Sequence, residues 1–158
     1  MKRVTGADLA ELSAQAKGAP RRRTHLSVHA EPKDPVQRLF IAFEPGTYVR
    51  PHRHPEPNKW ELVVLFGGSI DLVTLDDQGR VAERIALGLG ETRAAEIPPN
   101  TWHAYVCREP GTLLLEIKEG PYVPTTPENF ASWSPPEGDA AAAAYLERLG
   151  TAKPGERV

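Results

Sequence analysis

The distribution of proline and glycine constrains the fold of this chain more than any other sequence feature. The 158 residues include 16 prolines and 13 glycines, which divide the sequence into short apolar runs. Helix interiors tolerate neither residue well, so most of the chain is expected to form strands and turns. The apolar and alternating runs predict short strands over residues 24–29, 36–43, 47–54, 60–66, 69–75, 80–87, 92–97, 101–107 and 112–118.

A helix is expected near each end of the chain. The first lies within residues 1–20, with Asp8 as its N-cap and Gly18 at its end. The second spans 139–150, capped at both ends, and residues 151–158 are expected to fray. Between the barrel strands and this helix, the proline-rich stretch is expected to cross the surface. Its candidate anchors are Tyr122, Phe130 and Trp133.

These elements predict an all-β sandwich or barrel with a short helix at each terminus. The expected organisation is an N-terminal helical extension over 1–23 and a barrel over 24–119. A C-terminal segment and helix over 120–158 is expected to pack on the barrel.

Composition and charge exclude several classes of protein. The net charge of −2 gives no electrostatic reason to expect a nucleic-acid partner. Cys107 is the single cysteine, so an internal disulfide is excluded. The sequence has no apolar run long enough to span a bilayer and no apolar leader at its N-terminus. A cytoplasmic protein without membrane or nucleic-acid partners is therefore expected.

A pair of histidines provides the first sign of a functional site. His52 and His54 are one residue apart, so on a strand both rings would point to the same face. Glu61 follows in the next apolar run, on the same face as Val63 and Leu65. A third histidine, His103, lies in a later strand-like run.

These residue types suit a transition metal. Imidazole nitrogens with one carboxylate oxygen favour Fe, Mn, Ni, Co or Zn as divalent ions, and do not suit calcium. A six-coordinate ion held by His52, His54, Glu61 and His103 would keep two positions for water or substrate. Three alternatives stay open. Glu56 competes with Glu61 for the role of carboxylate ligand. In the other two, Glu61 accepts a hydrogen bond from a ligand histidine instead of binding the metal, or His29 or His25 approaches the pocket.

The same residues resemble the two motifs of the cupin superfamily. The first motif appears as Gly46, then His52-x-His54, then Glu61 and Gly68, with a gap before the glutamate that is longer than usual. The second appears as Pro98-x-Asn100-x-x-His103, with asparagine in place of a glycine; asparagine also enters the left-handed region. The resemblance implies a double-stranded β-helix, or jelly-roll, barrel.

More narrowly, residues 24–135 resemble the WbuC-type cupin metalloproteins, a family whose reaction is undefined. The likeness is carried by Gln37-Arg38, Pro51-His52-Arg53-His54-Pro55, Ile97 to His103, and Lys118-x-Gly120-Pro121-Tyr122. It implies a metal-binding protein that acts on a small polar molecule, such as a sugar derivative or an oxo-acid. A homodimer is also implied by the resemblance alone.

Three functions remain open at this point. In the first, the chain is a metalloenzyme of an isomerase/epimerase-like or Fe(II) oxygenase-like kind, with Glu61 or a tyrosine such as Tyr105 carrying the proton. In the second, it is a non-catalytic module that binds or senses a small molecule through the same metal. In the third, the metal only braces a structural dimer.

Overall fold

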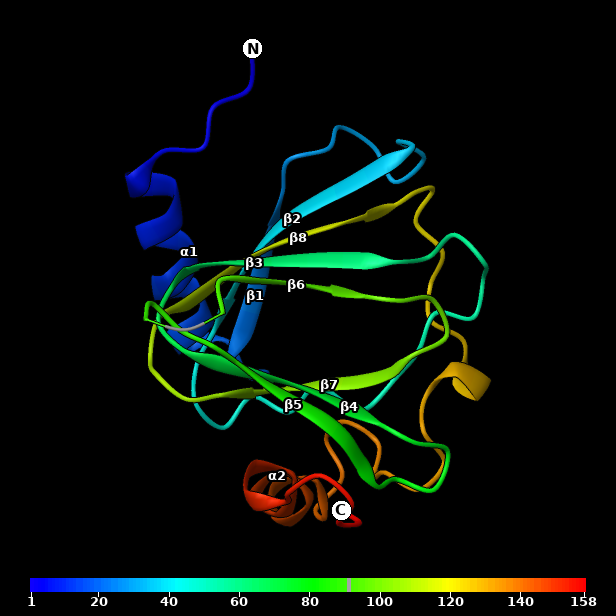
Figure 1. Ribbon diagram of the computed structural model, residues 1–158. Coiled ribbons are helices and arrows are strands. Elements are labelled where there is room, and N and C mark those ends of the chain that lie inside the picture. Colours follow the sequence, from blue (N-terminus) through cyan, green and yellow to red (C-terminus); the bar gives the residue numbers. More distant parts are fainter. Residues whose placement is uncertain (91) are drawn as a thin grey trace.

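Two antiparallel β-sheets face each other and form the body of the molecule in the computed structural model, which describes residues 1–90 and 92–158 (Figure 1). The large sheet has the order β1-β2-β8-β3-β6 and the small sheet has the order β5-β4-β7. The large-sheet strands are β1 (Arg23–Ser27), β2 (Val36–Phe43), β8 (Thr112–Glu119), β3 (Glu61–Gly67) and β6 (Ala94–Ile97). The small-sheet strands are β5 (Val81–Leu87), β4 (Ile70–Leu75) and β7 (Trp102–Cys107). The predicted all-β architecture is confirmed.

The two-residue period of the strands sorts apolar side chains into three layers. Inward residues of both sheets, such as Phe43, Leu65 and Leu72, fill the space between the sheets. On the outer face of the large sheet, Phe40 and Ala42 pack against helix α1 (Gly6–Gly18). The outer face of the small sheet packs against the C-terminal segment and helix α2 (Ala142–Thr151), which lies beneath this sheet in Figure 1.

Because the small sheet is covered on both faces, all six residues of β7 are buried. Trp102 and Ala104 belong to the outer apolar layer, whereas Tyr105 belongs to the layer between the sheets. The alternation along β7 therefore turns His103 and Tyr105 toward the barrel interior.

Both terminal helices are present, but their caps differ from the predicted ones. Thr5 is the N-cap of α1, and Asp8 is its partner three residues on: the amide of Asp8 donates to the Thr5 hydroxyl and that of Thr5 donates to the Asp8 carboxylate. Such a reciprocal pair is a capping box, in which Asp8 takes the third helical position rather than the cap itself. In α2 the N-cap is Ala141, and the helix continues through Gly150.

The predicted fraying of residues 151–158 is wrong. The backbone amide of Val81 donates to the carbonyl of Glu156, and the amide of Val158 donates to the carbonyl of Gly79. The tail therefore extends the hydrogen bonding at the start of β5, which satisfies backbone groups that would otherwise face solvent.

Residues 47–54, predicted as a strand, do not form one. Pro51 and Pro55 remove backbone donors on either side of the histidine pair, so a continuous ladder cannot form. His52 alone makes bridges, pairing with His103 of β7 on one side and with Phe130 on the other. These bridges still fix residues 52–54, which we call the histidine segment, along the free edge of the small sheet.

The proline-rich segment after β8 contains the short 3-10 helix η1 (Pro127–Asn129), at the right of Figure 1. Of its three predicted anchors, Trp133 packs against the outer layer of the small sheet, and Phe130 pairs with His52. Tyr122 is 56% exposed, so it does not anchor the segment. Within the described part of the chain, no helix is both long and apolar enough to cross a membrane.

Candidate metal centre

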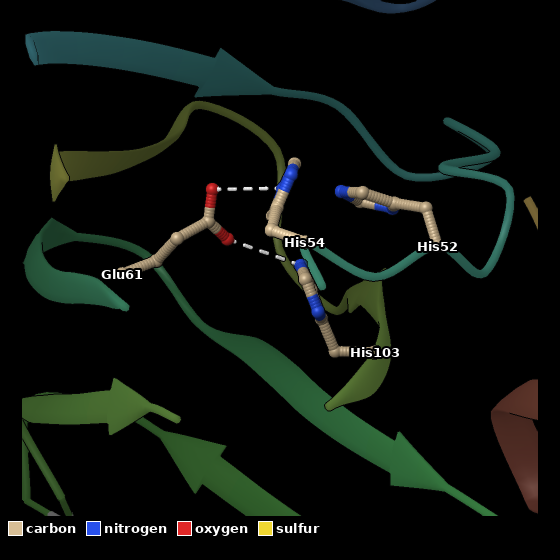
Figure 2. A group of neighbouring side chains, drawn as sticks. All are labelled: His52, His54, Glu61 and His103. Atoms are coloured by element: carbon tan, nitrogen blue, oxygen red, sulfur yellow. Dashed lines mark ion pairs between the residues drawn. The ribbon is translucent and has the colours of Figure 1, made fainter. Parts of the chain in front are cut away.

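Four side chains predicted from the sequence meet at one end of the space between the sheets. One ligand atom from each of His52, His54, Glu61 and His103 lies within 4.8 Å of those from the other three. Figure 2 shows the three imidazoles and the carboxylate pointing toward a common space. We call these four residues the histidine–glutamate cluster.

Three parts of the fold supply the cluster. Glu61 is the first residue of β3, and its side chain shares the inward face with Val63 and Leu65. His103 is the second residue of β7, next to the corner at Asn100, whose φ of 61° lies in the left-handed region as the motif requires. His52 and His103 exchange backbone hydrogen bonds of 3.1 and 2.9 Å, which holds the histidine segment against β7.

Backbone carbonyls orient two of the rings. Nδ1 of His52 lies 3.0 Å from the carbonyl oxygen of Arg50, and Nδ1 of His103 lies 2.9 Å from that of Thr101. A carbonyl accepts a proton but does not donate one, so in each ring Nδ1 carries the hydrogen. In the neutral ring, Nε2 then carries the lone pair that faces the cluster, which is the arrangement that metal-binding histidines use.

The carboxylate of Glu61 faces two of these nitrogens without satisfying them. Its oxygens lie 3.2 Å from Nε2 of His54 and 3.1 Å from Nε2 of His103. Both nitrogens are buried and neither has a hydrogen bond of acceptable geometry. In His103, where Nδ1 carries the hydrogen, the lone pairs of Nε2 and of the Glu61 oxygen repel at 3.1 Å unless a positive charge lies between them, and burial makes unpaired groups costly. The cluster therefore fits a cation, and its three nitrogens and one oxygen match a divalent transition metal.

The same proximity shifts the pKa values of the cluster. Burial raises the pKa of Glu61, but the contacts with His103 and His54 and the charge of Lys118 outweigh it, so the pKa lies well below its ordinary value. Burial and the neighbouring His103 lower the pKa of His52. For His103, burial acts to lower the pKa, yet the adjacent Glu61 raises it above its ordinary value. At neutral pH the carboxylate is ionised and His52 is neutral, as ligands must be.

A half-buried lysine supports Glu61 from the large sheet. Nζ of Lys118 lies 2.8 Å from Oε1 of Glu61 and 2.8 Å from Oε1 of Glu116. Glu61 and Lys118 are direct cross-strand partners. Neither Lys118 nor Glu116 is among the residues predicted for the site. They lie four and two residues after the buried Leu114, so the two-residue period of β8 places all three side chains on the inward face.

Tyr105 is the second inward residue of β7 beside the cluster. Its hydroxyl is buried and makes no hydrogen bond within the described part of the chain. Burial, with the charges of Glu61 and Glu116, raises its pKa well above the ordinary value. Tyr105 therefore keeps its proton at neutral pH and has one hydrogen bond left to donate.

A cavity of about 250 Å³ opens onto the cluster from the barrel interior. Its wall includes His52, His54 and Glu61, together with Tyr105 and Lys118. Water and a small molecule can thus reach the cluster, although the volume lies just under the usual range for drug-sized ligands.

The other candidates from the sequence lie outside the cluster. Glu56 is exposed in the loop before β3. His29 is engaged elsewhere, with Nδ1 3.0 Å from both the backbone nitrogen and the carbonyl oxygen of Arg38. His25 is exposed but lines the cavity. The structure therefore brings none of the alternative ligands into the cluster.

Several solved structures resemble this fold at low sequence identity. KdgF from Halomonas sp. aligns over 66% of this chain and 84% of its own, with 19% identity and a TM-score of 0.51. TT1209 from Thermus thermophilus aligns over 75% of this chain and 97% of its own, with 18% identity and a TM-score of 0.53. A mutant of Bacillus subtilis oxalate decarboxylase OxdC aligns over 85% of this chain but 36% of its own, with 18% identity and a TM-score of 0.52. These likenesses establish the fold alone, and it is the predicted cupin barrel.

A search of curated proteins finds no match. The family is established by a comparison with models of protein families. A family model described as "Domain of unknown function (DUF6016)" matches residues 4–87, which include α1, strands β1 to β5 and three members of the histidine–glutamate cluster. Since this match covers more than half of the chain, the protein belongs to the DUF6016 family of domains of unknown function.

Proposed function

We propose that this cupin-fold protein holds a divalent transition-metal ion through His52, His54, Glu61 and His103, and presents it to a small polar molecule in the barrel. The observation that carries the proposal is the pair of buried, unsatisfied Nε2 atoms of His54 and His103 facing the Glu61 carboxylate. The sequence likeness to WbuC-type cupins supports the same function. A sugar derivative or an oxo-acid is the proposed class of molecule.

Within this proposal, each polar residue has a distinct role. A bound ion would supply Lewis acidity, polarising a carbonyl or hydroxyl group of the ligand. Glu61 is ionised and held by Lys118, so it serves as a metal ligand rather than as a proton carrier. Tyr105 keeps its proton and has an unused hydroxyl beside the cluster, so it donates a hydrogen bond, or a proton, to the ligand. An isomerase/epimerase-like reaction would use these groups.

A non-catalytic binding function is the second candidate. Among the described residues, Glu61 and Glu116 are the carboxylates that line the 250 Å³ cavity, and both contact the Lys118 ammonium. A carboxylate held in this way is a poor base, which favours binding over proton abstraction. Incubation of the metal-loaded protein with sugar derivatives and oxo-acids, followed by mass spectrometry, separates the two functions: a new product supports the enzyme, and an intact bound ligand supports the binding module.

Replacing His52 with alanine is expected to abolish stoichiometric metal binding. The substitution removes one of the four donor atoms, and the three that remain form an incomplete metal site. Elemental analysis of protein purified without a histidine tag measures the metal content. His25→Ala is the matched control, because His25 lines the same cavity but lies outside the cluster. Equal metal content in His52→Ala and the native protein would contradict the proposal.

Metal affinity is expected to fall as the pH falls below neutrality. Glu61 raises the pKa of His103 above its ordinary value of 6.5. Protons therefore begin to compete with the metal for this histidine at a pH above 6.5, and the competition strengthens as the pH falls. Each proton that must be displaced weakens the apparent affinity by about tenfold per pH unit below the pKa. Competition titrations against a chelator of known proton affinity, from mildly acidic to mildly alkaline pH, measure this slope. An affinity independent of pH over that range would contradict imidazole ligation.

A further inference from the structure

Three arginines surround a second cavity, whose wall also includes His52. This cavity has a volume of about 410 Å³, and Arg21, Arg23 and Arg50 line it together with His52 and Phe130. Its wall contains one acidic residue among those that the structure describes, Glu137. We call this cavity the arginine pocket. With three positive charges and one negative charge, it is suited to an anion.

Two of the arginines already hold a carboxylate. Arg21 donates to both oxygens of Glu137, at 2.6 and 2.7 Å, and Nη2 of Arg23 lies 2.9 Å from each of the same oxygens. The side chain of Arg23 is only 12% exposed, and its Nη1 is fixed by Thr47 and by the carbonyl of Tyr48. The pocket thus contains a rigid guanidinium whose geometry accepts the planar carboxylate group.

The charge of Arg50 is not matched in this way. Its Nε donates to the Ser134 hydroxyl and its Nη2 donates to the carbonyl of Ala131, at 3.2 and 2.9 Å. Both partners are neutral, and among residues 1–90 and 92–158 no carboxylate forms an ion pair with it. The guanidinium also lies 5.3 Å from the centre of the Phe130 ring, which flanks His52. Arg50 is therefore held in place with one nitrogen, Nη1, and a full positive charge left for a ligand.

We propose that the ligand of this protein is a small organic acid whose carboxylate group binds Arg50 in the arginine pocket. This inference rests on the proposed metal centre, because His52 belongs both to the pocket wall and to the histidine–glutamate cluster. Arg50 and His52 line the same pocket, so an acid whose carboxylate binds Arg50 lies in a cavity whose wall includes a member of the cluster. The contacts of Arg21 and Arg23 with Glu137 show that guanidinium groups of this pocket bind a carboxylate, and titration with phosphate tests whether that preference extends to Arg50.

The test is calorimetric titration of metal-loaded protein with acetate, pyruvate, glycolate and malonate at constant ionic strength. Inorganic phosphate and acetamide are titrated in the same way. We expect at least one carboxylate to bind, and Arg50→Met to weaken that binding by at least about tenfold, as loss of a charged hydrogen bond should. Arg50→Lys is expected to recover only part of the affinity, because it keeps the charge but loses the planar fork.

Arg3→Met is the matched control, since Arg3 is exposed near the N-terminus and lines neither cavity. Metal content and melting temperature are measured on every sample, so a failure of the metal centre is seen separately from a failure of carboxylate binding. Equal carboxylate affinity in Arg50→Met and the native protein would overturn the inference. So would the absence of carboxylate binding, or tighter binding of phosphate or acetamide, in native protein that retains its metal.

Discussion

Glu61→Gln is expected to lower the affinity of the protein for divalent transition metals by more than about 100-fold, beyond what loss of an outer-shell partner costs. Glu61 is 2% exposed and is the one carboxylate of the histidine–glutamate cluster. Glutamine keeps the shape of the side chain but removes the negative charge. Its amide nitrogen replaces one of the two carboxylate oxygens, so it can donate to Nε2 of only one of the two histidines, His54 or His103. The variant cluster would therefore depend less on a cation than the native one.

Direct titration with Co(II) or Zn(II), followed by absorption or calorimetry, measures this loss. Glu56→Gln is the matched control, because Glu56 is exposed in the neighbouring loop and lies outside the cluster. Lys118→Met adds a second comparison: it removes the ammonium that contacts Glu61, so it should alter the affinity without removing a donor atom. If Glu56→Gln lost metal and Glu61→Gln kept it, the assignment of the carboxylate ligand would be wrong.

Asp71→Asn is expected to lower the free energy of unfolding by about 3–5 kcal/mol, as removal of one partner from a buried ion pair does. The Asp71 side chain is 8% exposed and lies 2.7 Å from Nη1 of Arg84 and 3.0 Å from Nε of Arg108. The two arginines also donate to backbone carbonyls at the end of α2: Arg84 to Ala152 and Arg108 to Gly150, both at 2.8 Å. Asp71 thus orients the positive charges that hold the C-terminal end of this helix on the small sheet.

For a chain of this length, such a loss corresponds to a drop in melting temperature of roughly 6–20 °C. Thermal and urea unfolding followed by circular dichroism measure it. Glu83→Gln is the matched control, since Glu83 is exposed on the neighbouring strand β5, and we expect a change within about 0.5 kcal/mol. A loss below about 1 kcal/mol for Asp71→Asn, well under the cost of breaking a buried pair, would show that the arginines hold α2 without this carboxylate.

The strands were predicted well because their signal is local. Prolines and glycines mark the turns, and β2 begins and ends at the predicted residues 36 and 43. The turn between β4 and β5 is closed locally, because Asp76 accepts hydrogen bonds from the amides of Gln78 and Arg80. The errors lie where the outcome depended on partners elsewhere: the tail after residue 150 pairs with β5, and residues 47–54 meet single residues of β7 and of the C-terminal segment.

The sequence by itself determined the chemical type of the site, because two histidines one residue apart, a carboxylate and a third histidine in cupin-like motifs specify donor atoms. It also determined that Glu61 shares a face with Val63 and Leu65, since the strand period is a local property. Only the tertiary structure decided what surrounds those donors. Lys118 reaches Glu61 through strand register, and Arg21 and Arg23 meet Glu137 from the opposite end of the chain. Such contacts depend on how distant segments pack in three dimensions, and no local pattern of residues records that packing.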